Sequence, residues 1–404
     1  MRREIICGLD IGTSKISVIL GEFSLPHKLN ILAKAKVEPE GLERGKVLDI
    51  EKFTHSIESV MHMTGADREL KPVRIILGVG NDSLRISQYR RSSVLSERSQ
   101  EIKNFHIERL REETLEMAVP FDHEVLHIFS KEFMVDGQAQ IRDPRGMFGN
   151  RISADFLLVT ISSSVLHNIK RGIYNAGYAV DTVVFSDLAS AFTLLDEGER
   201  NEGVIFLKIG GGMTTVVKFS GGVPVFLEII PFGGIDIDTT IAKALGISQE
   251  EAKELREKYG GFPPGLPQEK IIIEKSGKVV KCNELAGIIN RALERVLFQI
   301  RKRIEKYQKL DYLPYGIVLG GGVFLFEGLV EKVEEVFRLP ARLGVVKDVE
   351  DSTGKESNFY AWADPLGLVK FSPPTQVSNP AIDKHLNPFQ RLFLRTKKIF
   401  EEYF

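Results

Sequence analysis

Two segments that lie far apart in the sequence share one pattern: an apolar strand runs into a glycine-containing turn and out into a second apolar strand. The first turn, Gly12 to Lys15, follows the mainly apolar residues 5–11, and the second, Gly210 to Thr215, follows the apolar residues 204–207. Glycine lets the backbone approach a ligand closely, and successive amides in such a turn can bind an anion. The repeat predicts two related halves that clamp a polyphosphate between them.

The residues of these turns are the candidate nucleotide-binding set. We expect Asp10 at the mouth of the first turn, where a carboxylate can hold a hydrated Mg²⁺ ion. A third glycine turn, at residues 320–322, would let a flat base lie against the backbone. The candidates are Asp10, Gly12, Thr13, Ser14 and Lys15 on one side of the phosphates, Gly210, Gly211, Gly212 and Thr214 on the other, and Gly321 and Gly322 beside the base. The plain alternative is a tight hairpin with a surface aspartate.

The composition is that of a globular protein. The 404 residues are 43% hydrophobic, which is enough for several compact cores, and a net charge of −1 gives no overall attraction to nucleic acid. Cys7 and Cys282 are far apart in the sequence, so we expect free thiols in a reducing cytosol. The N-terminus enters a strand without a signal-like apolar segment, and no apolar run is long enough to cross a bilayer. We therefore expect a cytoplasmic protein that has no nucleic-acid partner.

Longer motifs extend the pattern over nearly the whole chain. They are GLDIGTSK at Gly8 to Lys15, DPRGMFGNRISAD at Asp143 to Asp155, SDLASAF at Ser186 to Phe192, EIIPFGG at Glu228 to Gly234 and VLGGGVFLFEGL at Val318 to Leu329. On these motifs and its amphipathic C-terminus, the chain resembles the actin and sugar-kinase superfamily and, within it, the FtsA family of bacterial cell-division proteins. The resemblance implies an α/β, actin-like, duplicated (RNase H-like) two-domain fold with an inserted small α/β subdomain. It also implies ATP binding and polymerisation into actin-like protofilaments.

The chain departs from the family pattern where phosphate chemistry would take place. Relatives read DIGGGTTD at the second turn, whereas Lys208, Met213 and Thr215 stand here, so both carboxylates are missing. We expect slow hydrolysis or none, and we assign no catalytic residue. An ammonium about 4 Å from a phosphate charge gains roughly 4 kcal/mol at an effective dielectric constant near 20. Lys208 is therefore expected to pair with Asp10 or with the phosphates, so that nucleotide binds with little need for Mg²⁺.

Other positions near the turns carry weaker expectations. The adenosine-side pair of the family falls on Lys253 and Arg256, and Arg256 is a candidate to stack on the base. Asp187 and Asp236 are lesser candidates for positioning a water molecule. The alternative for Lys208 is that its side chain extends to solvent beside an empty cleft.

The sequence also predicts domain boundaries. The first actin-like domain comprises residues 1–80 and 162–198 with a return at 346–371, the inserted SHS2-like subdomain 81–161, the second domain 199–232 and 286–345, and a small subdomain 233–285. In the resembled family the insertion takes part in protofilament contacts and partner binding, and the small subdomain receives the C-terminal tail of the ring protein FtsZ. Basic contacts for that tail are expected near Arg291, Arg295 and Arg301. His106, His123 and His127 lack metal-ligand spacing and are expected to be surface or structural residues.

The C-terminal segment predicts membrane attachment. Residues 372–387 contain several prolines and read as a flexible linker, and a helix over 388–404 would gather apolar residues on one face. The expected membrane-binding residues are Phe389, Leu392, Phe393, Ile399, Phe400 and Tyr403, with Arg395, Lys397 and Lys398 on the basic side. Each large apolar side chain gives roughly 1.5 to 3 kcal/mol on burial, so the helix should lie reversibly in an anionic interface. The alternative is a helix that docks on the protein's own core.

Three functions suit the glycine turns. A small-molecule kinase needs a general base that the second turn does not offer, and a type IV pilus assembly adaptor of the PilM kind would not be expected to end in a basic amphipathic helix. The preferred interpretation is an actin-like filament subunit that binds ATP and tethers the FtsZ ring to the cytoplasmic face of the cell membrane at the division site. Other division proteins would be further partners.

Overall fold

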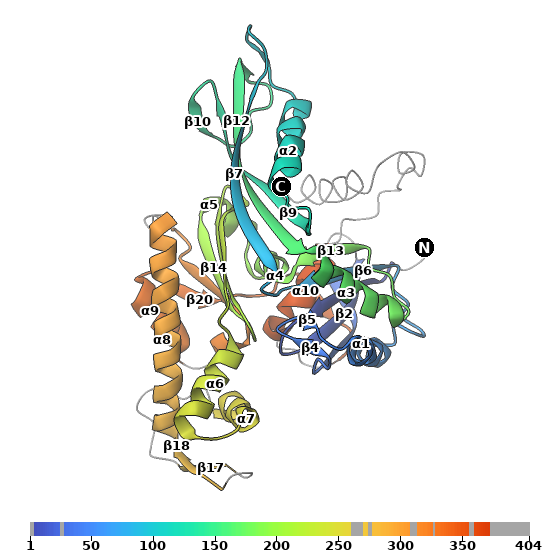
Figure 1. Ribbon diagram of the computed structural model, residues 1–404, viewed down its shortest axis with the longest axis vertical. Helices are drawn as coiled ribbons and strands as arrows, with labels where there is room; N and C mark the ends of the chain where they lie inside the picture. Colours follow the sequence, from blue (N-terminus) through green and yellow to red (C-terminus); the bar gives the residue numbers. More distant parts are fainter. Residues whose placement is uncertain are drawn as a thin grey trace.

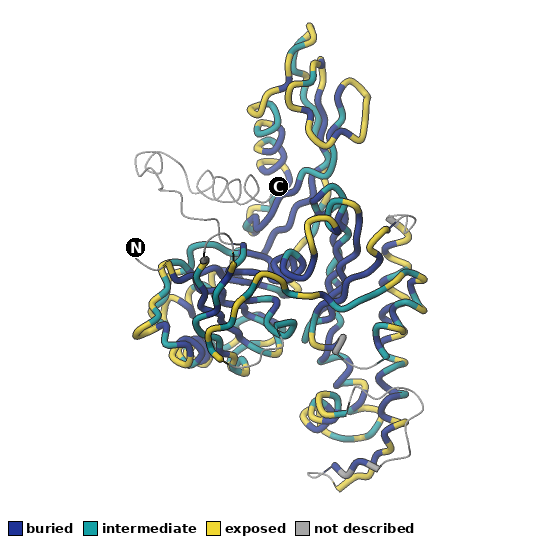
Figure 2. Tube along the Cα trace, turned by 180° about the vertical axis from the view of Figure 1, so that it is seen from behind, coloured by how far each residue is buried: buried dark blue, intermediate teal, exposed yellow. Residues whose placement is uncertain are grey.

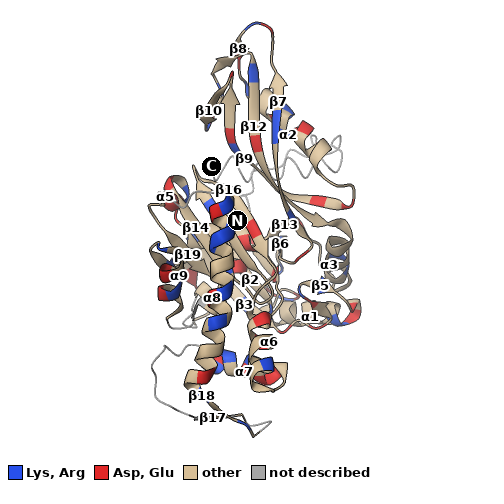
Figure 3. Cartoon of the chain, turned by 60° about the vertical axis from the view of Figure 1, so that its left-hand side comes forward, with Lys and Arg blue, Asp and Glu red and all other residues tan. Residues whose placement is uncertain are grey.

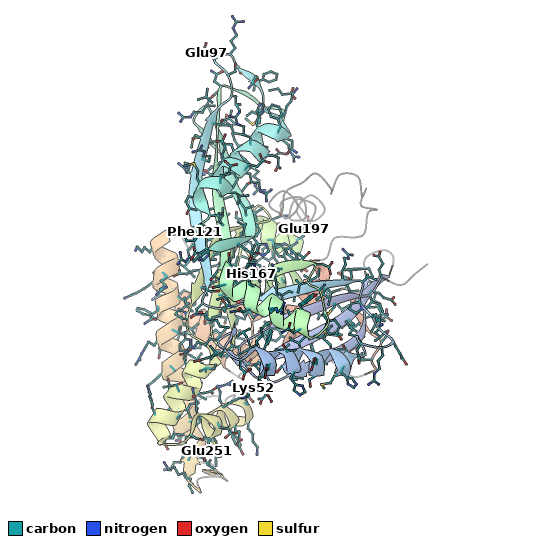
Figure 4. All side chains as sticks on the ribbon, turned by 45° about the vertical axis from the view of Figure 1, so that its right-hand side comes forward. Lys52, Glu97, Phe121, His167, Glu197 and Glu251 are labelled. Atoms are coloured by element: carbon teal, nitrogen blue, oxygen red, sulfur yellow. The ribbon has the colours of Figure 1, made fainter. Side chains whose placement is uncertain are left out.

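The computed structural model describes residues 4–24, 28–259, 270–273, 277–307, 313–325, 328–354 and 359–371. The predicted linker, the predicted membrane helix and all membrane-binding candidates lie outside the described residues. The described chain forms an elongated molecule, with the insertion at one end and the small subdomain at the other (Figure 1). Figure 4 marks these two ends with Glu97 and Glu251, and it places Lys52 on the outer side of the first domain.

The first domain is built on a six-stranded sheet of order β13-β6-β1-β2-β3-β21. Its strands are β1 (Ile6–Ile11), β2 (Ile16–Ser24), β3 (Lys28–Val37), β6 (Arg74–Val79), β13 (Thr182–Phe185) and β21 (Val349–Asp351), and β4 (Leu42–Glu43) and β5 (Lys46–Val47) form a small separate hairpin. Helices α1 (Ile50–Thr64) and α3 (Ser163–Asn175) pack on one side, and α4 (Ser186–Leu194) and α10 (Ala363–Lys370) on the other. Both faces of this sheet are therefore buried.

The second domain repeats the strand order of the first. Its five-stranded sheet runs β16-β15-β14-β19-β20, which matches β3-β2-β1-β6-β13 position by position. The strands are β14 (Val204–Ile209), β15 (Thr214–Ser220), β16 (Val223–Ile230), β19 (Ile317–Gly320) and β20 (Ala341–Leu343). In the first domain β1 pairs antiparallel with β2 and parallel with β6. In the second domain β14 pairs antiparallel with β15 and parallel with β19. The predicted duplicated fold is confirmed by this shared order.

Helices of the second domain cover its sheet and extend into the small subdomain. They are α6 (Gly234–Leu245), α7 (Gln249–Tyr259), α8 (Cys282–Tyr307) and α9 (Leu329–Phe337), with the short strands β17 (Lys270–Ile272) and β18 (Val279–Lys281) paired beside them. The apolar face of α8 buries Leu285, Leu293 and Leu297 in a core that the second domain and the small subdomain share. Short segments complete the chain: α5 (Glu197–Glu202) and the 3₁₀ helices η1 (Gly322–Leu325) and η2 (Phe359–Trp362).

The insertion is a four-stranded sheet of order β10-β9-β12-β7 with one helix on it. Its elements are β7 (Leu84–Val94), β8 (Gln100–Glu101), α2 (Asn104–Ala118), β9 (His123–Val135), β10 (Gln138–Ile141), β11 (Phe148–Gly149) and β12 (Arg151–Ser162). The lower halves of β9 and β12 join the core shared by the two large domains, where Phe129 and Leu157 are buried (Figure 2). None of the helices in the described part of the chain combines the length and apolar character that a membrane span needs.

Candidate nucleotide site

The two glycine turns have the same construction. Strand pairing ends at Ile11 with Ile16 in the first half and at Ile209 with Thr214 in the second, which leaves residues 12–15 and 210–213 as the turns. Each turn is closed by its own backbone: the Gly12 amide donates to the Lys15 carbonyl at 3.0 Å and the Gly210 amide to the Met213 carbonyl at 2.8 Å. These two glycine amides are therefore already used, and an anion would have to bind the later amides of each turn.

The turns face each other and touch. A methyl group added at Gly212 would lie 2.7 Å from the Thr13 hydroxyl, and one added at Gly211 would lie 3.0 Å from the Ser14 side chain. A side chain at 212 would have to displace Thr13, and one at 211 would make a tight contact with Ser14, so glycine favours this close approach at both positions. Entry of a triphosphate between the turns requires the two domains to move apart.

The second turn is anchored on the start of α6. The Gly234 amide donates to the Gly210 carbonyl at 3.0 Å, and the Ile235 amide donates to the Gly211 carbonyl at 2.9 Å. Arg256 of α7 lies over Gly234, where a methyl group would be 3.5 Å from its guanidinium group. The guanidinium is fixed by Asp238, with contacts of 2.5 and 3.2 Å. The structure thus places the predicted base-stacking residue next to the second turn, held in a defined orientation.

The third glycine turn packs against the end of β14. Gly321 has a φ of +91°, and a methyl group there would lie 2.2 Å from the Ile209 carbonyl oxygen, so only glycine fits. Nothing lies within 4 Å of the corresponding position on Gly322. The Tyr360 hydroxyl donates to the carbonyls of Leu319 and Gly321 at 3.1 and 3.2 Å and so ties this turn to η2. Of the two glycines expected beside the base, Gly322 has the open side.

A buried charge cluster lies beneath the turns. The Lys208 ammonium on β14 forms an ion pair with Asp187 on α4 and another, at 2.5 Å, with Asp364 on α10. Thr215 donates a hydrogen bond to the other Asp187 oxygen at 2.5 Å. Because Lys208 belongs to the second domain and both aspartates to the first, the cluster joins the domains. We name Lys208, Asp187 and Asp364 the lysine clamp.

Asp10 belongs to the same buried region but not to the clamp. Its carboxylate accepts a hydrogen bond from Ser186 at 2.6 Å and one from Ser17 at 3.4 Å, and the residue is 3% exposed. The sequence placed Asp10 at the open mouth of the turn, and the structure corrects this because the carboxylate lies below the turn against α4. The expected pairing of Lys208 with Asp10 is likewise replaced by hydrogen-bonded ion pairs with Asp187 and Asp364. The alternative of a solvent-directed Lys208 is wrong, since the residue is 7% exposed.

Burial and neighbouring charges together set the pKa values of this region. Burial lowers the pKa of the Lys208 ammonium, but the carboxylates of Asp187, Asp364 and Asp10 outweigh it and hold that pKa above its ordinary value. Burial raises the pKa of Asp364, yet Lys208 and Lys15 bring it below its ordinary value. Burial, followed by the negative charge of Asp364, raises the pKa of Asp10 to about 7. Lys208 and Asp364 are therefore charged near neutral pH, whereas Asp10 is near its titration midpoint.

Two other predicted phosphate contacts are engaged within the protein. The Lys15 ammonium donates to the Ala361 carbonyl at 2.6 Å and lies 5.9 Å from the centre of the Trp362 ring. The Thr214 hydroxyl donates to the Phe232 carbonyl at 2.8 Å. The Lys15 ammonium must break its contacts with η2 before it can bind a phosphate. The Thr214 hydroxyl is bound to the backbone at Phe232, which connects β16 to α6.

The residues near Asp10 do not fit a divalent cation. A site for Mg²⁺ offers several oxygens and no competing positive charge, whereas the carboxylates here surround the Lys208 ammonium. Within the described ranges no cluster of three histidine, cysteine, aspartate or glutamate residues is arranged to bind a metal. We therefore assign no metal-dependent step to this chain.

Two ion pairs close the outer side of the site. Arg44, in the hairpin after β3, contacts Asp236 at the start of α6 at 3.0 Å, and Lys253 on α7 contacts Glu38 at 2.5 Å. Asp236 also accepts a hydrogen bond from the Gly233 amide, so its carboxylate caps α6 as well as pairing with Arg44. Both residues considered for positioning a water molecule already have ionic partners: Asp187 is in the lysine clamp, and Asp236 is paired with Arg44.

Sequence reasoning missed Asp364 and Tyr360. Both lie at the return of the chain to the first domain, and their partners are more than a hundred residues away or in another domain. The available signal was small: Asp364 precedes Pro365 at the start of a helix, a position where an acidic residue is common.

The fold and the site define an actin-like protein that carries an inserted SHS2 subdomain. A family model for the SHS2 domain inserted in FtsA matches residues 83–160, and one for the cell division protein FtsA matches residues 205–363. A cell division protein FtsA from Borreliella burgdorferi is 30% identical over 390 residues, covering 94% of this chain and 93% of that protein. One from Bacillus subtilis is 31% identical over 384 residues, covering 91% and 83%. The chain belongs to the FtsA family of cell division proteins.

Solved structures agree on the fold. The PilM–PilN type IV pilus biogenesis complex gives a TM-score of 0.68 at 15% identity, covering 91% of this chain and 98% of that one. MreB5 of Spiroplasma citri, solved with ADP bound, gives 0.53 at 12% identity, covering 94% and 98%. At these identities the likeness shows the actin-like fold alone.

Proposed function

We propose that this chain binds ATP between its glycine turns, assembles into actin-like protofilaments, and tethers the FtsZ ring to the cytoplasmic face of the membrane. The observation that carries the nucleotide part is the pair of identically built turns that face each other across the domain boundary. In this proposal the phosphates would be bound by the backbone amides of the two turns and by two nearby cations. The amides are those of Thr13, Ser14, Gly211 and Gly212, and the cations are Lys15 and Arg256. Membership of the FtsA family supports the division role.

In this proposal ATP binds with little need for Mg²⁺ and turns over slowly. The Lys208 ammonium stands where relatives carry a carboxylate, and its charge is balanced by Asp187 and Asp364. A carboxylate that could ligate Mg²⁺ is thereby lost, and the two aspartates that remain nearby already accept from the Lys208 ammonium. The carboxylates that could orient water are paired with cations, which argues against rapid hydrolysis.

Partner binding would use the outer surfaces. The FtsZ C-terminal tail would bind the small subdomain, near Arg291, Arg295 and Arg301 on α8, which carries Lys and Arg residues from Arg291 onward (Figure 3). Arg301 is partly committed there, because it pairs with Glu305 at 2.7 Å and donates to the Val336 carbonyl at 2.6 Å. Arg291 and Arg295 are therefore the better candidates. Self-association and other division proteins would use further faces, including the insertion.

The membrane part rests on the sequence of the C-terminal segment. An amphipathic helix with a basic side binds anionic lipid more strongly when many copies are linked in a filament. The predicted helix would therefore hold filaments, rather than single molecules, on the inner face of the cell membrane.

One experiment tests both parts. The purified full chain is mixed with anionic vesicles and a fluorescent ATP analogue, with Mg²⁺ or with a chelator. We expect nucleotide binding to persist in the chelator and the protein to sediment with the vesicles, whereas a Phe393→Asp, Phe400→Asp double variant stays in the supernatant but still binds nucleotide. Loss of nucleotide binding in the chelator would contradict the role of Lys208. Sedimentation of the double variant would contradict the membrane helix.

A further inference from the structure

A fully exposed aromatic side chain lies where the insertion joins the first domain. Phe121 is 102% exposed, and Met117, in the last turn of α2, is 73% exposed (Figure 4). Val119 and Pro120 lie between them and are half-buried. We name Met117, Val119, Pro120 and Phe121 the elbow patch. Two exposed large apolar side chains within one short segment favour an interaction site over chance exposure.

The backbone of the elbow patch is fixed by hydrogen bonds on both sides of Phe121. The His123 amide donates to the Pro120 carbonyl at 3.0 Å. The Ser163 amide, at the start of α3, donates to the Asp122 carbonyl at 2.8 Å. Phe121 is therefore exposed because the fold directs its side chain outward from a defined turn.

The outward side of α2 beside the elbow patch is acidic. Glu112, Glu116 and Asp122 are exposed, and within the described ranges none of the three is in an ion pair. On the neighbouring helix α3, Lys170 contacts Glu124 at 3.3 Å, so this ammonium already has an acidic partner. An occupant of the elbow patch would therefore need an apolar face and positive charge.

The C-terminal segment of the same chain has the matching chemistry. The sequence predicts a helix over residues 388–404, with an apolar face that includes Phe393 and Phe400 and a basic side that includes Arg395 and Lys398. We propose that this helix docks on the elbow patch of its own chain when no lipid is bound. The inference rests on the proposed membrane helix, and it assigns that helix a second binding surface.

The described chain ends close enough for this docking. The Phe371 ring lies 5.9 Å from the ring of His127 on β9, and Phe121 precedes His127 by six residues. At about 3.3 Å per residue these six residues span about 20 Å at most. The predicted linker, residues 372–387, can extend to about 50 Å. A tether of this kind gives an effective concentration in the mM range, so even weak docking would be populated.

Docking and lipid binding would exclude each other, because both bury the same apolar face of the helix. The apparent affinity for lipid falls in proportion to the undocked fraction. Copies that are linked in a filament bind a bilayer with avidity, whereas a single molecule does not. The elbow patch would therefore retain the helix in single molecules and release it to the membrane in assembled ones.

The first test is hydrogen exchange of residues 388–404 in the purified full chain without lipid. These amides should be protected, and Phe121→Asp should lower the docking equilibrium constant at least about tenfold and remove the protection. The control is Phe105→Asp, which replaces a 61% exposed aromatic residue at the other end of α2 and should leave the protection unchanged. Glu116→Lys keeps the apolar patch and should weaken docking about two- to fivefold.

Sedimentation with phosphatidylglycerol vesicles gives a second readout. Phe121→Asp should reach half-maximal binding at a lipid concentration at least about twofold lower than the unmodified chain and Phe105→Asp do. Equal exchange or equal lipid dependence of the two variants would overturn the docking. Protection that grows with protein concentration would assign the patch to a second copy and overturn docking within one chain. If no form binds vesicles, the proposed membrane helix is contradicted, and hydrogen exchange still decides the docking.

Discussion

Removal of the Lys208 charge should lower the free energy of unfolding, because the buried carboxylates around it would lose their counter-charge. In Lys208→Met the side chain keeps its apolar length, but Asp187 and Asp364, both nearly buried, lose their cation. Breaking a buried ion pair from one side typically costs about 3 to 5 kcal/mol in the free energy of unfolding. The loss here should fall in that range, because Thr215 and Ser190 continue to donate hydrogen bonds to the two carboxylates.

The assay is urea unfolding followed by the fluorescence of Trp362, the only tryptophan in the chain. It lies in η2, next to the clamp residue Asp364. The control is Lys253→Met, which removes a more exposed cation from Glu38 and should cost less than about 1 kcal/mol.

The pH dependence of the stability loss in Lys208→Met can contradict this reasoning. Without Lys208 the pKa values of the buried carboxylates rise in the folded state, so the variant is stabilised where they are protonated and loses that stability as the pH rises. The deficit relative to the unmodified chain should therefore be larger at alkaline than at acidic pH. A deficit no larger than that of Lys253→Met, or one that does not change with pH, would show that the clamp is not the buried ionic link described above.

Further substitutions test other parts of the site. His127 accepts a hydrogen bond from the Phe185 amide at 3.0 Å, and burial lowers its pKa to about 3. Its contribution to the free energy of unfolding is therefore complete above the unfolded-state pKa of 6.5 and is lost as the pH falls below that value. By pH 5 this loss is about 2 kcal/mol, and His127→Gln should remove that part of the pH slope in unfolding titrations. Gly321→Ala should destabilise the protein by more than about 2 kcal/mol in calorimetry, whereas Gly322→Ala, with open space around it, should not. Arg44→Ala should change stability by less than about 1 kcal/mol but speed association of a fluorescent ATP analogue, measured by stopped flow, because it opens one ion pair between the domains.

Local features were predictable from the sequence. The glycine turns occur where the pattern of apolar strand and glycine places them. Helix α1 begins after Asp49, a residue type common at helix N-caps, whose side chain accepts from the Glu51 and Lys52 amides. The start of α7 shows reciprocal bonds between Ser248 and Glu251, whose spacing is that of a capping box. These features depend on neighbouring residues only, which is why a single sequence indicates them.

The pairing of charges was not predictable in the same way. Lys208 had several carboxylates available, and its choice of Asp187 and Asp364 depends on how α4 and α10 pack across the first domain, which no local pattern encodes. The closeness of the turns is also a property of the domain arrangement, since Thr13 meets Gly212 only when both halves are folded. The motif therefore located the two turns, and tertiary structure determined which of the nearby groups already have partners.

The bond between Lys15 and the Ala361 carbonyl connects the first turn to the route by which the chain leaves the first domain. From Ala361 the backbone passes directly into α10 and reaches Phe371, after which the C-terminal segment begins. A ligand anion that attracts the Lys15 ammonium would detach this turn from that exit path. If the proposed nucleotide site is used in this way, occupancy of the cleft would be coupled through Lys15 and η2 to the point at which the chain leaves the first domain.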